Sequence, residues 1–221
     1  MNKKQNPKTP TCFLVNDQEH LAASQALKAT RTNLLSILSS YPNQAKSICF
    51  TSPEEGSGCT FNCINVAASF ANMGAKVLLI DTDLRNPSAN ICLDITESRG
   101  LSDVLDGQYD LVKAVYSCPH VGNMFVLPAG TMPHNPTELL LSEKFNTILK
   151  ELEAQYDYIF IDTPPVCAFT DAAIISQKTL GTILVCKSGY TKFDIAQKAQ
   201  HILEQGGGKI LGTILNGISP K

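Results

Sequence analysis

Long hydrophobic runs are missing from the sequence. No apolar stretch in the 221 residues approaches the roughly 20 residues that a membrane-spanning helix needs. The first residues, MNKKQNPKTPT, are polar, and no hydrophobic region of a secretory signal follows the lysines. These absences predict a cytoplasmic protein that is neither exported nor anchored by a span of its own.

The sequence also has no excess of charge of either sign. It contains 18 Lys and Arg residues against 20 Asp and Glu residues, which gives a formal net charge of -2. Nonspecific binding of nucleic acid or of anionic lipid depends on clustered positive charge that neutralises phosphates. We therefore predict no nucleic-acid partner.

Cysteine is present, but without the spacing of a metal site. The eight cysteines form no C-x-x-C pair, and several of them interrupt apolar runs. They lie at positions 12, 49, 59, 63, 92, 118, 167 and 186. In a chain without an export signal, this pattern favours small buried hydrophobic side chains over metal or cluster ligands.

Short apolar runs rich in Val and Ile alternate along the chain with longer helix-like stretches. The runs lie at residues 47–50, 77–80, 124–127, 158–161, 182–185 and 210–215. The helix-like stretches lie at residues 18–40, 61–72, 136–154 and 193–205. This alternation is typical of an α/β fold with a doubly wound, mostly parallel sheet and helices on both faces.

The domain organisation follows from the same pattern. Residues 1–17 carry two prolines and little periodicity, so we predict a flexible N-terminal arm there. Residues 18–221 show no internal repeat and no low-complexity tract, and 43% of the whole chain is hydrophobic, which suits one globular core. We therefore predict a single domain after the arm.

A loop that suits phosphate binding follows the first predicted strand. Residues 51–60 read TSPEEGSGCT and lead directly into a helix. In such a unit the backbone N–H groups and the helix dipole face an anion. We therefore assign nucleotide phosphates to the backbone of Gly56, Ser57, Gly58, Cys59 and Thr60. Taken alone, a glycine-containing turn of this kind is more often structural.

Carboxylates follow two further predicted strands. Asp81 and Asp83 come directly after the run at 77–80, and Asp162 comes directly after the run at 158–161. Parallel strands end at one edge of the sheet, and Mg²⁺ takes hard oxygen ligands while bridging to phosphates. We predict that Thr60 and the three aspartates hold Mg²⁺. The alternative is that Asp83 and Asp162 only cap the turns that follow them.

These segments together resemble the bacterial tyrosine kinases of capsular and exopolysaccharide operons, the CpsD/CapB family of P-loop proteins. Residues 51–60 are similar to the Walker A motif of that family, residues 79–85 to Walker A' and residues 159–162 to Walker B. The resemblance covers about residues 21–216 and extends to the segments NPTELL and LPAG. It implies a P-loop NTPase-type sheet.

The resemblance also implies an activity, a cofactor and partners. A protein of this family binds ATP with Mg²⁺ and phosphorylates tyrosines of a protein substrate. It works with a membrane-embedded polysaccharide co-polymerase, at the inner face of the plasma membrane, and forms homo-oligomers. By this resemblance Asp81, Asp83 and Asp162 are catalytic, with Asp81 assisting deprotonation of the tyrosine, and Asn216 reaches the adenine.

The chain departs from the family pattern at the Walker A lysine. Cys59 occupies that position, and no Lys or Arg lies between Lys46 and Lys76, while Glu54 and Glu55 add two negative charges. The loss of one charge-assisted hydrogen bond costs about 1.5–3 kcal/mol, which is roughly 10- to 150-fold in affinity or rate. The simplest interpretation is that Cys59 is a small residue, tolerated at this position once the lysine is no longer needed. The alternative is a redox-sensitive thiol whose pKa the helix N-terminus lowers.

Two further departures concern self-recognition. The family carries an E-x-x-R-x-x-R pattern at its oligomer interface, and the matching positions here are Gln25, Lys28 and Arg31. The family also carries a C-terminal tyrosine cluster, whereas the last tyrosine here is Tyr190. Either a tail is missing or this chain has no self-substrate in the usual place.

Two functions remain from the sequence. The first is an ATP-dependent protein-tyrosine kinase with weakened activity that regulates capsule or exopolysaccharide synthesis. The second is a non-catalytic regulatory subunit of the co-polymerase complex. A partition-type ATPase is disfavoured, because such proteins use a lysine earlier in the loop that is also missing here.

Overall fold

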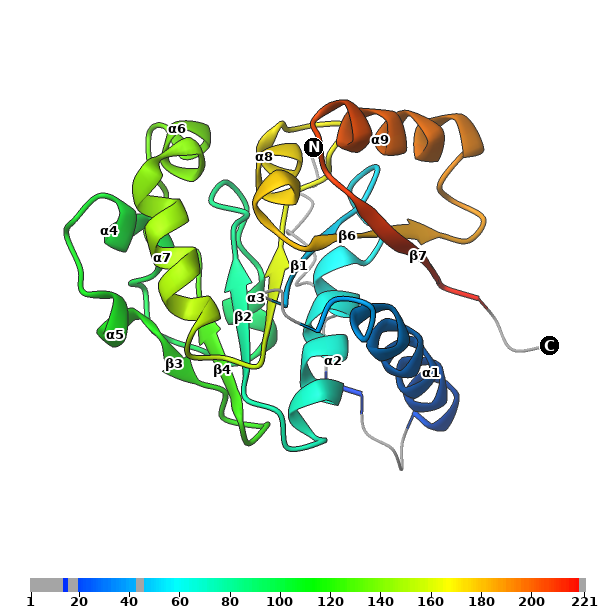
Figure 1. Cartoon of the computed structure of the whole chain (residues 1–221), viewed down its shortest axis with the longest axis horizontal. Coiled ribbons are helices and arrows are strands. Elements are labelled where there is room, and N and C mark those ends of the chain that lie inside the picture. Colours follow the sequence, from blue (N-terminus) through cyan, green and yellow to red (C-terminus); the bar gives the residue numbers. More distant parts are fainter. Residues whose placement is uncertain (1–13, 16–19, 43–45, 219–221) are drawn as a thin grey trace, which may run out of the picture.

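The computed structural model describes residues 14–15, 20–42 and 46–218, and it forms an α/β sandwich around one seven-stranded sheet (Figure 1). The strand order is β3-β4-β2-β5-β1-β6-β7, and every pairing is parallel except that of β3 with β4. The strands are β1 (Ser47–Thr51), β2 (Val77–Asp81), β3 (Tyr116–Ser117), β4 (Met124–Leu127), β5 (Tyr158–Asp162), β6 (Gly181–Lys187) and β7 (Ile210–Asn216). The predicted fold class is therefore confirmed.

Helices cover both faces of this sheet. They are α1 (Leu21–Leu38), α2 (Cys59–Ala71), α3 (Ala89–Cys92), α4 (Leu101–Leu105), α5 (Leu111–Ala114), α6 (Pro136–Leu141), α7 (Glu143–Glu153), α8 (Asp171–Lys178) and α9 (Phe193–Gln205). Figure 1 shows α1 beside α2, well apart from α6 and α7.

Alternate residues of each central strand belong to different cores, as the two-residue period of a strand requires. In β1, Ile48 and Phe50 pack with α1 and α2, whereas Cys49 packs with the cluster that contains α7. In β5, Phe160 belongs to the first cluster and Ile159 to the second. Both faces are thus apolar, which explains the continuous apolar runs of the sequence.

The main difference from the expected elements is at residues 136–154. The sequence predicts one helix there, but Ser142 has φ -60° and ψ 150°, so its backbone is extended and the stretch divides into α6 and α7. The Ser142 hydroxyl accepts a hydrogen bond from Phe145 N at 3.3 Å and caps α7. The single-helix prediction is wrong because serine competes with the helix for backbone hydrogen bonds.

Most of the predicted N-terminal arm lies outside the described residues. Of residues 1–17, only Leu14 and Val15 are described; Leu14 packs against the core, and Val15 N donates a hydrogen bond to Asn65 Oδ1 at 2.7 Å. These two residues therefore lie against the domain.

The described cysteines form no disulfide. Four of them, Cys49, Cys63, Cys118 and Cys186, are buried, and three are half-buried. This agrees with the expectation of small hydrophobic side chains. Within the described part of the chain, no helix is long and apolar enough to cross a membrane.

Candidate functional site

The loop between β1 and α2 forms one side of the candidate site. Its last residue, Gly58, precedes α2 with φ +86°, a left-handed conformation that favours glycine. A Cβ atom at Gly58 would also lie 2.2 Å from Asn216 Nδ2. The loop therefore depends on glycine at this position, and it leads the chain into the first turn of α2 with its unpaired backbone N–H groups.

Asn216, at the carboxyl end of β7, contacts the loop from the second strand beyond β1 in the sheet. Its Nδ2 donates a hydrogen bond to Ser57 O at 3.0 Å. Asn216 also lines a mostly apolar groove of about 650 Å³ between α1 and β7, together with Phe61 and Asn62 of α2. The predicted adenine contact therefore lies between the phosphate loop and an open groove.

Asp81 and Asp162 lie side by side, because β2 pairs with β5 in the register that puts these two residues opposite each other. Asp81 is fully buried and accepts backbone hydrogen bonds from Asp83 N at 3.0 Å and from Ala89 N at 3.2 Å. Burial, and then the charge of Asp162, raise the pKa of Asp81 well above its ordinary value. Two carboxylates thus compete for one proton or one cation.

Asp162 is the less satisfied of the two carboxylates. Its side chain is buried, and its Oδ1 atom has no hydrogen-bond partner. Burial raises the pKa of Asp162 to about 7, although side-chain hydrogen bonds from Thr60 and Cys59 oppose the rise. A buried carboxylate oxygen without a donor fits a cation or a water that a cation holds.

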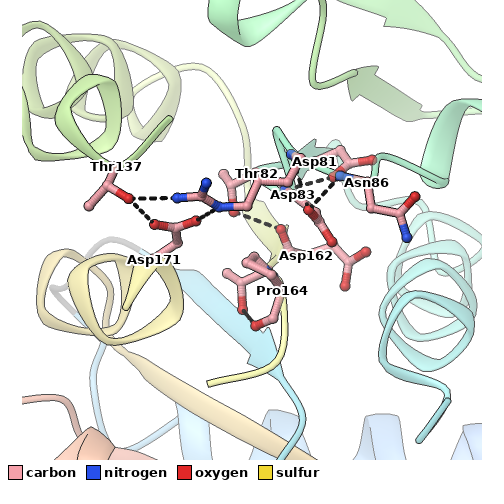
Figure 2. Close-up of polar contacts among 10 residues, drawn as sticks. Asp81, Thr82, Asp83, Asn86, Thr137, Asp162, Pro164 and Asp171 are labelled. Atoms are coloured by element: carbon pink, nitrogen blue, oxygen red, sulfur yellow. Dashed lines mark hydrogen bonds and ion pairs between the residues drawn. The ribbon is translucent and has the colours of Figure 1, made fainter. Parts of the chain in front are cut away.

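The third predicted carboxylate has a second role. Asp83 Oδ1 accepts hydrogen bonds from Asn86 N at 2.9 Å and from Arg85 N at 3.2 Å, so it caps the turn after β2. Figure 2 shows Asp81, Asp83 and Asp162 gathered at the same edge of the sheet. The capping alternative is therefore realised for one oxygen of Asp83, and its other oxygen is left for the site.

The donor set suits Mg²⁺ bound with phosphate better than a metal held by protein alone. In the described part of the chain, no three His, Cys, Asp or Glu side chains are close enough to hold an ion between them. Mg²⁺ usually takes one or two carboxylates, and substrate phosphates and waters complete its six oxygens. Thr60 Oγ1, which accepts a hydrogen bond from Ser88 Oγ at 3.3 Å, is one more oxygen beside Asp162.

Cys59 begins α2 beside Asp162. Burial, and then the charge of Asp162, raise the pKa of the Cys59 thiol well above its ordinary value. This is opposite to the lowering that the helix N-terminus alone would produce, so the redox-sensitive interpretation of the sequence loses its physical basis. The thiol stays neutral and gives the loop no positive charge.

A polar network holds the turn after β2; an ion pair of Arg85 with a neighbouring carboxylate is one of the alternatives that the sequence offers, but its partners could not be named from it. Arg85 Nε donates to Asp171 Oδ2 at 3.2 Å, and Arg85 Nη2 donates to Thr137 Oγ1 at 2.8 Å. The Thr137 hydroxyl donates to Asp171 Oδ1 at 2.7 Å, and the guanidinium lies 4.9 Å from the ring centre of Phe169. In Figure 2, Thr137 and Asp171 face each other across the gap between two helices. The network ties the aspartate-bearing turn to α6 and α8.

We expect Asp171→Ala to lower the free energy of unfolding by about 2–3 kcal/mol, below the 3–5 kcal/mol of a fully buried pair because Arg85 is partly exposed. Asp171 is fully buried, and its loss leaves Arg85 and Thr137 without their shared acceptor. Urea unfolding measures the change. Asp106→Ala, at an exposed carboxylate, is the control and should stay within about 0.5 kcal/mol of wild type; an equal loss in both variants would contradict this assignment.

The three residues predicted at the oligomer interface lie on α1, away from the loop. Gln25 and Lys28 are exposed, whereas Arg31 Nη1 donates to Ser69 O of α2 at 2.9 Å. Arg31 therefore contributes to the packing of α1 on α2, and the structure does not bring these residues to the aspartates.

The chain matches a family model described as an AAA domain over residues 45–191. It is 34% identical over 216 residues to a Staphylococcus aureus protein named "Putative tyrosine-protein kinase CapB", and the match covers 98% of this chain and 92% of CapB. It is 41% identical over 178 residues to the tyrosine-protein kinase CpsD of Streptococcus pneumoniae serotype 4, with coverage of 79% and 77%.

Solved structures agree with these relatives. The chimerical protein CapA2B2 superimposes with a TM-score of 0.85 at 28% identity, over 95% of this chain and 94% of that one. The septum site-determining protein MinD of Pyrococcus horikoshii, in complex with Mg-ADP, gives a TM-score of 0.67 at 28% identity, over 78% and 70%. At least one structural neighbour with this fold thus binds Mg-ADP.

Proposed function

Because this chain belongs to the family of the tyrosine-protein kinases CapB and CpsD, we propose that it binds Mg-ATP and transfers the γ-phosphoryl group, slowly, to tyrosines of a protein substrate. The observation that carries the proposal is the paired carboxylates of Asp81 and Asp162 at the edge of the sheet, with Asp162 Oδ1 buried and unpartnered. Such an arrangement suits a cation, and the phosphate loop lies beside it.

Each residue has a distinct part in this proposal. The backbone N–H groups of residues 56–60 bind the phosphates, and Thr60, Asp81, Asp83 and Asp162 hold Mg²⁺ directly or through water. When bound, Mg²⁺ neutralises the charge that develops on the phosphates. Asp81 assists deprotonation of the attacking tyrosine hydroxyl, a role that rests on the resemblance to the family. Asn216 contacts the adenine.

The transfer is proposed to be slow because Cys59 supplies no charge to the phosphates. Its thiol stays neutral beside Asp162, and Glu54 and Glu55 leave the loop negative. The same observation favours a second candidate function, a regulatory subunit that keeps the fold and the nucleotide but transfers no phosphate. The two differ in one measurable property, the phosphorylation of an added tyrosine peptide.

We further propose the setting that its family membership suggests. The protein acts in the cytoplasm, associates with itself and with a membrane-embedded polysaccharide co-polymerase, and thereby influences capsule or exopolysaccharide synthesis.

The test of the nucleotide site is calorimetry with ADP in the presence and absence of Mg²⁺. We expect measurable binding that weakens at least tenfold when Mg²⁺ is replaced by EDTA, because the carboxylates repel phosphate without the cation. Asp81→Asn should remove most of this Mg²⁺ dependence. Asp157→Asn, at an exposed carboxylate, is the control. Binding of equal strength with and without Mg²⁺ would show that these aspartates hold no metal.

A further inference from the structure

Positive charge is scarce around the phosphate loop. The sequence has no Lys or Arg between Lys46 and Lys76. Arg85, in the turn after β2, already bonds to Asp171 and Thr137. A positively charged side chain for a polyphosphate bound at the loop would therefore have to come from another element at the edge of the sheet.

The carboxyl end of β6 brings one lysine to this place. β6 pairs with β1 so that Leu184 lies opposite Thr51, the last residue of β1, and β6 then continues to Lys187. Lys187 is paired in turn with Asn216 of β7, whose side chain bonds to the phosphate loop. Lys187 thus extends past the end of β1, level with the beginning of the loop.

The strand period places the Lys187 side chain on the α2 face of the sheet. Ile183 and Val185 both pack in the core cluster that contains α2, and side chains two residues apart lie on one face. Lys187 continues this series beyond the core, at the end of the sheet where α2 begins. Among the residues that the structure describes, no carboxylate lies within ion-pair distance of its ammonium.

The turn after β6 connects Lys187 with the loop itself. The Lys187 ammonium lies 5.3 Å from the centre of the Tyr190 ring. The Tyr190 hydroxyl lies 4.0 Å from the position of a Cβ atom added to Gly56, so the ring reaches the phosphate loop. Tyr190 is half exposed, so its ring and the Lys187 ammonium lie together at the surface beside the phosphate loop.

Hydrogen bonds that do not involve the lysine side chain hold this turn. Ser188 N donates to Asn216 O at 2.8 Å, Thr191 N donates to Lys187 O at 2.9 Å, and Lys187 N donates to Thr191 Oγ1 at 3.0 Å. Replacement of the Lys187 side chain therefore removes a charge and leaves the hydrogen bonds of the turn in place.

We propose that Lys187 binds the phosphates of the nucleotide and supplies, from the end of β6, the positive charge that the loop lacks at Cys59. The proposal rests on the nucleotide-binding function proposed above and names a residue for it. A lysine ammonium on a flexible stem is a suitable point charge for a polyphosphate. It would act on the side of the loop opposite the aspartates, so the phosphates would lie between the ammonium and Mg²⁺.

The test is calorimetry with Mg-ADP on four forms of the chain: wild type, Lys187→Met, Lys187→Arg and Lys192→Met. Lys192 is an exposed lysine five residues further on, at the start of α9, and its replacement makes the same change of charge. We expect Kd to rise about tenfold in Lys187→Met, as for one lost charge-assisted contact. The rise should stay below about threefold in Lys187→Arg and about twofold in Lys192→Met.

The salt dependence gives a second readout that a structural role would not change. The difference between wild type and Lys187→Met should shrink at 0.5 M NaCl, where the Debye length falls to about 4 Å. Equal Kd values for Lys187→Met and Lys192→Met would overturn the role of Lys187 and leave the nucleotide site standing. A wild-type chain that binds no Mg-ADP would overturn both.

Discussion

Cys59→Lys is expected to tighten the binding of Mg-ADP at least tenfold and to raise phosphate transfer to an added tyrosine peptide by at least as much. The substitution reduces the negative charge of the loop segment by one unit and places an ammonium beside Asp162 and the phosphates. Thr60, Asp81 and Asp162 already lie at the same edge of the sheet. Calorimetry and a radiolabelled transfer assay measure the two effects.

Cys59→Met is the matched control for this variant, since it adds length without charge. We expect it to change Kd by less than about threefold. A gain with lysine alone identifies a kinase site that is limited mainly at one residue. No gain in either binding or transfer would mean that other parts of the site have also changed. The regulatory-subunit function would then explain the site better than the kinase function.

Asp162→Asn is expected to flatten the pH dependence of stability in the metal-free protein. Because burial raises the pKa of Asp162 to about 7, the folded state holds this proton more tightly than the unfolded state. The associated stability is fully present below the unfolded pKa near 4 and is lost as the pH rises through about 7. Wild type should therefore lose about 2 kcal/mol more than the variant between pH 5 and pH 8.

Urea unfolding in EDTA at pH 5, 6, 7 and 8 measures this difference. Asp81 contributes with the same sign, and its pKa should fall when the charge of Asp162 is removed. Asp106→Asn, at an exposed carboxylate, should follow wild type at every pH. If the stability of wild type stays constant or rises relative to the variant from pH 5 to pH 8, burial does not raise the pKa values of the two carboxylates.

The proximity of Asp81 and Asp162 could be predicted because it depends on strand topology alone. Each aspartate follows an apolar run, and neighbouring parallel strands end at the same edge of a sheet. The loop before α2 could be predicted for a similar reason, since its glycines and its place between a strand and a helix are both local features. Features that depend on a short segment of sequence, or on where strands end, could therefore be predicted from the sequence.

The sequence offers an ion pair for Arg85, but the partners of that residue could not be predicted in this way. Its partners Thr137 and Asp171 lie 52 and 86 residues away. They meet Arg85 only because α6 and α8 pack over the same end of the sheet, and no pattern in the sequence fixes that packing. The division of residues 136–154 at Ser142 was missed for another reason, since its apolar periodicity continues on both sides of the break.

The strand order has a consequence for how the protein is made. β1 is the first strand of the chain, but Ser47 pairs with Ile159 and Ile48 pairs with Gly181, so both neighbours of β1 come late in the sequence. During synthesis from the N-terminus, β1 and its loop must wait for β5 and β6 to leave the ribosome before they can be framed by the sheet. A nascent chain that stops before β5 contains the loop sequence but lacks β5 and β6, the two strands between which β1 lies and which position the loop for a ligand.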